Sequence, residues 1–328
     1  MTTFNYPLRF KTIFKEKIWG GNKINTVLGK DYAPLANCGE TWELSAVPGN
    51  VSEVVNGALK GQNLKNLCTD FASEIMGKSV AATYGTEFPL LIKYIDAAAD
   101  LSVQVHPNDE VALQKHGCKG KTEMWYIMQA DQGAMLNSGF ALQTNKEEYA
   151  KAIEEGRSLD YLHFEETQSG DVFFMPAGRI HYIGKGIMLA EIQQTSDITY
   201  RIYDFDRVDD KGHKRELHIK DGVEALDFEV LPSYKTSYKA EANKATSLVK
   251  SPFFNTNIID LKSSQSFALT LEGRDSFTIL ICVEGEGVLN GGFEAEAMQP
   301  GDVLLLPSEL KNAVLNSTVG IKVLEVYL

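Results

Sequence analysis

The sequence of 328 residues holds few cysteines, and no two of them form a CxxC pair. They are scattered along the chain, at Cys38, Cys68, Cys118 and Cys282. Reduced thiols are the simplest interpretation of this pattern, and we therefore expect a cytoplasmic protein.

Long apolar runs are also missing. No stretch approaches the roughly 18 apolar residues of a membrane span, and the first ten residues, MTTFNYPLRF, lack the apolar core of a signal peptide. We therefore expect no membrane span. The phosphate-binding patterns GxGxxG and GxxxxGKS/T are absent, which weakens the case for a nucleotide-dependent enzyme.

Basic residues are outnumbered, with 32 Lys and Arg against 44 Asp and Glu, so the formal net charge is −12. Nucleic acids and anionic membranes bind positively charged surfaces, and neither is expected as a partner. A protein of this charge that handles an anionic substrate needs a local cluster of basic residues.

Short runs of β-forming residues make up most of the chain. They include TWELSAV, FPLLIKYI, LSVQVH, EMWYIMQ, DVFFMP and ITYRIYDF, and most are bounded by Gly, Pro, Asn or Asp, as in sandwiches and barrels. Helical periodicity is confined to residues 62–78, 108–116 and 145–155, where Asn108 and Asn145 are the expected N-caps of the second and third. The pattern predicts a mostly β fold with small helical insertions.

An internal repeat divides this fold in two. SGDVFFMP at 169–176 returns as PGDVLLLP at 300–307, and a hydrophobic strand with a Gly/Asn turn precedes each copy. The repeat favours two related β-barrels in tandem, although Gly-Asp before a strand is also a common turn signal. Residues 231–250 are polar and read as a linker or extended edge, which puts a domain boundary near 235–245.

Only the first copy carries a set of candidate metal ligands. Read with a period of two, LSVQVHPND (101–109) places Gln104 and His106 on one face. Glu123 is the only acid at the mouth of an otherwise uncharged strand, and His181 ends a G-x5-P-x-G-x2-H pattern that begins at Gly170. The second copy continues after Pro307 as SELK, without a histidine.

Two histidines, a carboxylate and an amide form a set that suits Zn²⁺, with Fe²⁺, Mn²⁺ and Co²⁺ less well excluded. Taken singly, each residue is explained more simply by satisfied burial or by surface exposure. Taken together, the four favour a metal site.

These motifs resemble those of one known family. G-x5-P-x-G-x2-H is the second half of the cupin signature. In combination with FKEKIWGG, GETWELS, LSVQVHPND, GKTEMWYI and EIQQTSDITYR, it is similar to the short bacterial form of type I mannose-6-phosphate isomerase. That family also has Gln and His where other cupins have paired histidines, which fits Gln104 and His106.

The resemblance implies a fold of two tandem cupin (jelly-roll-like) β-barrels with a small helical insertion. The catalytic cupin domain would span 1–240, with helical insertions at about 60–80, 108–117 and 145–157. A degenerate cupin domain without a metal site would span 241–328.

The resemblance also implies a reaction, the interconversion of mannose 6-phosphate and fructose 6-phosphate by proton transfer through a cis-enediol. One Zn²⁺ per chain would be held by Gln104, His106, Glu123 and His181. The expected partner is a small-molecule sugar phosphate, and the protein would be a monomer or a homodimer.

Three residues are candidates for catalysis. Lys121 lies two residues before Glu123, hence on the same strand face, and a desolvated lysine beside a cation would have a lowered pKa, as a base requires. An ordinary phosphate-binding or surface lysine is the alternative. Arg201 lies in an apolar β run, where it needs an anion, and matches the family's E-x9-R block with Glu191. Asp197 would open the sugar ring or shuttle protons, unless it only forms a turn.

Lys93, Ser102 and Glu191 complete the site as possible substrate contacts, and Glu191 would orient Arg201 or Lys121. Two other functions stay open: a non-catalytic metal-containing cupin that binds sugar phosphates, and a metal-dependent cupin oxygenase. The first is expected to lack Lys121 or Arg201, and both are present.

Overall fold

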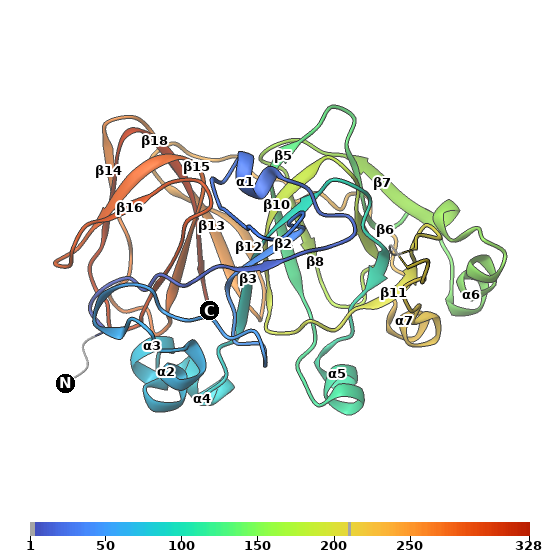
Figure 1. Ribbon diagram of the computed structural model, residues 1–328, viewed down its shortest axis with the longest axis horizontal. Helices are drawn as coiled ribbons and strands as arrows, with labels where there is room; N and C mark the ends of the chain where they lie inside the picture. Colours follow the sequence, from blue (N-terminus) through green and yellow to red (C-terminus); the bar gives the residue numbers. More distant parts are fainter. Residues whose placement is uncertain (1–3, 209–210) are drawn as a thin grey trace.

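The computed structural model describes residues 4–208 and 211–328 and has a mostly β fold in two halves. In Figure 1 the C-terminal strands gather on one side of the molecule and two further sheets on the other. The first sheet is antiparallel, in the order β1 (Ile13–Lys15), β2 (Glu40–Leu44), β3 (Leu90–Ala97), β10 (Ile187–Gln194), β5 (Glu123–Ala130), β8 (Val172–Met175).

The second sheet has five strands and faces the first. Its order is β11 (Tyr200–Tyr203), β4 (Val103–Val105), β9 (His181–Ile183), β6 (Met135–Phe140), β7 (Leu162–Glu166). Apolar side chains of both sheets, among them Ile95, Trp125, Leu136 and Ile183, form one core cluster between them. This space between the sheets is the interior of the first half.

The C-terminal half is a seven-stranded sheet. Its path runs β12 (Ala245–Lys250), β13 (Asn255–Leu261), β18 (Val314–Tyr327), β15 (Thr278–Asn290), β16 (Glu296–Met298), while β14 (Gln265–Ala268) pairs with β18 and β17 (Val303–Leu306) with β15. All three sheets are open, each ending at edge strands, so the expected closed barrels are not observed. The tandem-barrel arrangement stays a prediction.

The two halves share a large apolar core. The first sheet turns Tyr94, Met124 and Tyr126 toward this core, and the C-terminal half contributes residues such as Phe277 and Val326. The N-terminal segment also crosses over, because Leu8 pairs with Leu305 of β17. The boundary near residue 240 therefore separates two groups of strands that pack tightly, and the division into 1–240 and 241–328 stays a prediction.

The helices are short and lie outside the sheets (Figure 1). They are α1 (Lys23–Thr26), α2 (Leu64–Asp70), α3 (Ala72–Met76), α4 (Lys78–Tyr84), α5 (Asp109–His116), α6 (Lys146–Glu154) and α7 (Ile219–Ala225), with 3-10 turns η1 (Gly57–Leu59) and η2 (Ser158–Tyr161). The expected caps are confirmed, because Asn108 accepts a hydrogen bond from the N–H of Val111 and Asn145 from that of Glu148. None of the helices in 4–208 and 211–328 has the length and apolar character needed to cross a bilayer.

The helix expected over 62–78 is instead three short helices, which run on to Tyr84. Gly77 separates α3 from α4 with φ of 96°, and a Cβ there would lie 2.5 Å from the carbonyl oxygen of Asp275. The carboxylate of Asp275 then accepts the N–H groups of Lys78 and Ser79 at 2.7 and 2.9 Å, which caps α4. A residue of the C-terminal half thus decides where this helix begins. Residues 231–250, expected to be a linker or an extended edge, end in β12, which is an edge strand of the C-terminal sheet.

Candidate metal centre and active site

The ten predicted site residues come together at one end of the interior of the first half. Along each strand every second side chain faces this interior, and the alternation selects the polar ones. The six-stranded sheet contributes Lys93, Glu123 and Glu191, whereas Met124, Tyr126 and Ile192 point to the core shared with the other half. The five-stranded sheet contributes Gln104, His181 and Arg201, which lie side by side across β4, β9 and β11.

A cavity of about 200 Å³ opens at this place. Seven predicted residues line it: Lys93, Ser102, Gln104, Lys121, Glu191, Asp197 and Arg201. The other three, His106, Glu123 and His181, are buried, and Lys121 contacts two of them. The sequence analysis did not single out several further lining residues, among them Lys17, Glu40, Thr199 and Arg215.

His106, Glu123 and His181 form the candidate metal centre. One ligand atom from each lies within 4.8 Å of the others. The Nε2 atoms of His106 and His181 lie 3.5 and 3.4 Å from the two carboxylate oxygens of Glu123. The Gln104 amide lies 3.3 Å from His181 Nε2 and completes the predicted set of four.

Both histidines are held in the form that binds a metal. The Nδ1 atom of His106 lies 2.9 Å from the carbonyl oxygen of Ile198, and that of His181 lies 2.9 Å from the carbonyl oxygen of Arg179. Nδ1–H donation to these carbonyls leaves the Nε2 lone pairs directed at Glu123. Burial lowers the pKa of His106 well below its usual value and that of His181 to about 4, so both rings are neutral at neutral pH.

Glu123 is a buried carboxylate with one cationic partner. Lys121 Nζ lies 2.9 Å from its Oε2, whereas Oε1 accepts no hydrogen bond from the described residues. Burial and the nearby Glu191 raise the pKa of Glu123 above its usual range. A buried carboxylate in this state is unfavourable for the protein alone, and a cation between it and the two histidines would satisfy it.

Lys121 lies beside this centre, with Nζ 3.1 Å from His106 Nε2 and 4.0 Å from Glu191. Burial acts to lower its pKa, but the carboxylates of Glu123 and Glu191 outweigh burial and raise the pKa above the usual value. Glu123 and Glu191 therefore shift the pKa of Lys121 in the direction opposite to the one expected beside a cation.

A second ion pair extends the site along the six-stranded sheet. Lys93 Nζ lies 3.1 Å from Glu191, whose other oxygen accepts a hydrogen bond from Trp125 Nε1 at 3.0 Å. Glu191 thus contacts lysines rather than Arg201, and of its two expected partners it is near Lys121. Lys17 and Lys93 likewise flank Glu40; although burial acts to raise the pKa of that carboxyl, they lower it to about 2.

Arg201 and Asp197 lie on the opposite wall of the cavity. Arg201 donates from Nε to the hydroxyl oxygen of Ser102 at 3.3 Å and from Nη1 to the carbonyl oxygen of Glu216 at 2.9 Å. Asp197 is exposed at the mouth of the cavity. The site therefore combines buried lysine–carboxylate pairs on one wall with an arginine on the other.

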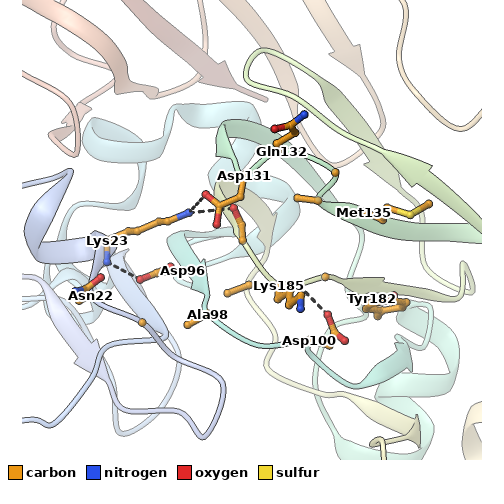
Figure 2. Close-up of a pocket in the computed structure, with 16 residues that line it drawn as sticks. Asn22, Lys23, Asp96, Ala98, Asp100, Asp131, Gln132, Met135, Tyr182 and Lys185 are labelled. Atoms are coloured by element: carbon orange, nitrogen blue, oxygen red, sulfur yellow. Dashed lines mark hydrogen bonds and ion pairs between the residues drawn. The ribbon is translucent and has the colours of Figure 1, made fainter.

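A larger cavity of about 480 Å³ lies elsewhere in the same half, where β3 and β5 end (Figure 2). Its polar groups are largely paired with one another: Lys23 Nζ contacts Asp131 at 2.9 Å, and the Lys23 and Lys185 N–H groups donate to Asp96 and Asp100. It contains no candidate metal ligand set among the described residues. The smaller cavity is therefore the candidate active site.

Comparison with known proteins gives a consistent result. Residues 8–145 match the family model of the type I phosphomannose isomerase catalytic domain, and residues 244–325 match that of the mannose-6-phosphate isomerase cupin domain. The chain is 38% identical over 307 residues to a mannose-6-phosphate isomerase of Streptococcus mutans, covering 93% of this chain and 94% of the relative. Mannose-6-phosphate isomerase ManA of Bacillus subtilis is also 38% identical, with 92% and 93% covered.

Solved structures agree with the sequence relatives. The crystal structure of the Bacillus subtilis mannose 6-phosphate isomerase superimposes with a TM-score of 0.88 at 31% identity, covering 98% of this chain and 99% of that one. A mannose 6-phosphate isomerase solved with zinc and yttrium has a TM-score of 0.79 at 18% identity over 98% and 99% of the two chains, and so shares the fold.

Proposed function

This chain belongs to the type I mannose-6-phosphate isomerase family, which makes it an aldose–ketose isomerase, and we propose that it interconverts mannose 6-phosphate and fructose 6-phosphate through a cis-enediol with one zinc ion. The observation that carries the metal proposal is the buried carboxylate of Glu123, with an unpaired Oε1, between two neutral histidines. Gln104, His106, Glu123 and His181 would hold the ion, a set typical of zinc. A relative of the same fold was solved with zinc.

The bound ion would neutralise the Glu123 charge that raises the Lys121 pKa and would stabilise negative charge on a sugar oxygen. The other parts of the reaction belong to the protein. Lys121 Nζ, buried and next to the centre, is our candidate to take a proton from C2 of the sugar and return it to C1. The ion pair with Glu191, 4.0 Å away, would fix the position of this ammonium group.

The remaining residues would bind and orient the substrate. Lys93 and Ser102 face the cavity and would donate hydrogen bonds to sugar hydroxyls or to phosphate. Arg201 would bind an anionic part of the substrate, because its guanidinium group has no carboxylate partner within ion-pair distance in 4–208 and 211–328. Asp197 is our candidate for the acid that opens the sugar ring at the exposed mouth of the site.

We also propose a cytoplasmic protein that acts as a monomer or homodimer, with a catalytic cupin domain over 1–240 and a degenerate one over 241–328. The four cysteines are free, and three of them are buried, which suits a reducing compartment. The acidic net charge supports a small-molecule substrate rather than a nucleic acid.

A coupled assay that detects fructose 6-phosphate tests this function. Protein stripped of metal is expected to be inactive on mannose 6-phosphate, and added Zn²⁺ should restore turnover. His181→Ala should stay inactive with zinc, while His163→Ala, a histidine on β7 outside the metal set, should behave as wild type. Stoichiometric zinc binding without turnover in the wild type would instead favour a non-catalytic cupin that binds sugar phosphates, and zinc-independent turnover would contradict the metal proposal.

A further inference from the structure

Two arginines hold one buried carboxylate beside the active-site cavity, and a third arginine lines the same cavity. Asp204, which follows β11, is 5% exposed. Arg215 donates from Nε to Asp204 Oδ2 at 2.7 Å and from Nη2 to Oδ1, while Arg207 Nη2 donates to Oδ1 at 2.6 Å. Burial acts to raise the pKa of Asp204, but these hydrogen bonds lower it, so the carboxylate is ionised. Together with Arg201, which also lines the cavity, this region holds three positive charges, and only Arg207 and Arg215 are paired with Asp204.

This cluster is the part of the cavity wall whose positive charge is not neutralised. The lysines Lys17, Lys93 and Lys121 each lie within 3.1 Å of a carboxylate oxygen. Of the two arginines of the wall, Arg215 shares the carboxylate of Asp204 with Arg207, and Arg201 has no carboxylate within ion-pair distance among the described residues. In a chain of net charge −12, this is the local basic cluster that an anionic substrate requires.

The two wall arginines are held in place and still have donors to offer. Arg201 uses Nε and Nη1 for hydrogen bonds to Ser102 and Glu216, and Arg215 uses Nε and Nη2 for Asp204. Arg201 Nη2 and Arg215 Nη1 have no hydrogen-bond acceptor among the described residues. Guanidinium groups fixed in this way lose little side-chain entropy when a ligand binds.

We propose that Arg215, fixed by Asp204, forms with Arg201 the subsite that selects a phosphorylated over a free sugar. This assignment rests on the proposed function, because it places the phosphate group of the proposed substrate against this wall of the cavity. Two terminal guanidinium nitrogens from separate arginines suit the oxygens of a phosphate dianion. Arg207 contacts the same carboxylate but does not line the cavity, so its role is to hold Asp204.

Steady-state kinetics of the zinc-loaded enzyme tests the assignment. Arg215→Ala is expected to raise the KM for mannose 6-phosphate about ten- to hundredfold with kcat nearly unchanged, since one charge-assisted hydrogen bond is lost in both ground and transition state. The inhibition constant of inorganic phosphate should rise in parallel. Arg215→Lys, which keeps the charge but not the planar fork, should lie between wild type and Arg215→Ala.

Lys214→Ala is the matched control. It removes the same charge from the neighbouring residue, whose partner is the exposed Asp206 and which does not line the cavity. Equal KM values and phosphate inhibition constants in Arg215→Lys, Arg215→Ala and Lys214→Ala would overturn the assignment.

Calorimetric titration with inorganic phosphate separates this proposal from the isomerase proposal. A wild type without turnover that binds phosphate, together with Arg215→Ala that does not, would support the subsite and reject the reaction. Turnover by the wild type, together with phosphate binding that is unchanged in Arg215→Ala and Arg215→Lys, would support the isomerase reaction and reject the subsite.

Discussion

Each half of the molecule buries a glutamate, and the two glutamates differ in what surrounds them. In the C-terminal half, Glu325 of β18 is 2% exposed and accepts hydrogen bonds on both oxygens, from Arg274 Nη1 at 2.9 Å and from Asn257 Nδ2 at 2.8 Å. Tyr327 covers the other side of the arginine, with 3.9 Å between ring centroid and guanidinium carbon. Glu123 of the first half is completely buried, and only one of its oxygens is paired, with Lys121 Nζ at 2.9 Å; the other accepts no hydrogen bond from the described residues.

The difference separates a structural carboxylate from a functional one. A buried charge that is paired and hydrogen-bonded is compatible with a stable fold on its own. A buried carboxylate that faces two neutral histidines and has one oxygen without a hydrogen bond is compatible with the fold only at a free-energy cost that a bound cation would remove. What surrounds a buried acid thus says more about function than its burial does.

The same contrast holds for the rest of the two interiors. The cluster that contains Leu280, Leu304 and Val323 is apolar, and the buried Glu325 of the same half is paired with Arg274. In the first half, apolar residues such as Trp125 and Ile127 fill only part of the interior, and the remainder is the cavity with its lysines and carboxylates. The interior of the C-terminal half is packed with apolar side chains, whereas part of the interior of the first half is the candidate active site.

Glu123→Gln should give the largest effect. It removes the only carboxylate of the proposed metal set, and we expect kcat/KM for mannose 6-phosphate to fall at least about a thousandfold. The free energy of unfolding of the metal-free protein should fall by less than the roughly 3 kcal/mol of a broken buried ion pair, because Lys121 loses its partner at 2.9 Å but keeps Glu191 at 4.0 Å. A coupled assay and urea unfolding measure the two quantities. Activity above a tenth of wild type, or a loss of stability as large as that of Glu325→Gln, would remove the contrast with Glu325.

Glu325→Gln should give the opposite result. It leaves the largely buried Arg274 without its charge partner, and we expect a loss of about 3 kcal/mol in the free energy of unfolding, measured in urea, with kcat unchanged. Glu284→Gln is the control on the same sheet. Glu284 is 61% exposed and pairs with Lys322, so its loss should cost less than about 1 kcal/mol. Equal losses in the two variants would mean that the buried pair does not stabilise the C-terminal half.

Features that depend on neighbouring residues could be predicted from the sequence. The period of two on β4 correctly placed Gln104 and His106 away from Val103 and Val105, which pack in the outer cluster. The repeated Gly-Asp also gives the same turn twice: Gly170 and Gly301 have φ of 91° and 94°, and each following Asp accepts an N–H three residues back along the chain.

Features that depend on contacts between distant segments could not be predicted from the sequence. Gly77 breaks the helical stretch because Asp275 approaches it from the other half, and no local pattern reports that contact. Arg215 lies in a run of mixed charges, DDKGHKRE, where nothing distinguishes it from Lys214 until the fold brings it beside Arg201. The pKa of Lys121 is raised by Glu123, two positions away, and also by Glu191, 70 positions away, and no local pattern reports the second contribution.

Added zinc should have the smallest effect on the free energy of unfolding. It tests whether the metal site of the first half also stabilises the C-terminal half. At a free concentration 100 times its dissociation constant, zinc should add about 2.7 kcal/mol to the free energy of unfolding of the wild type and almost nothing to Glu123→Gln. Because Tyr94 and Met124 share a core with Phe277 and Val326, we expect one cooperative transition, so Glu325→Gln should gain the same increment as the wild type. Urea unfolding followed by tryptophan fluorescence and by circular dichroism measures this. If two unfolding transitions appear and zinc shifts the urea midpoint of only one, the halves unfold separately. The shared core would then not couple them into one cooperative unit.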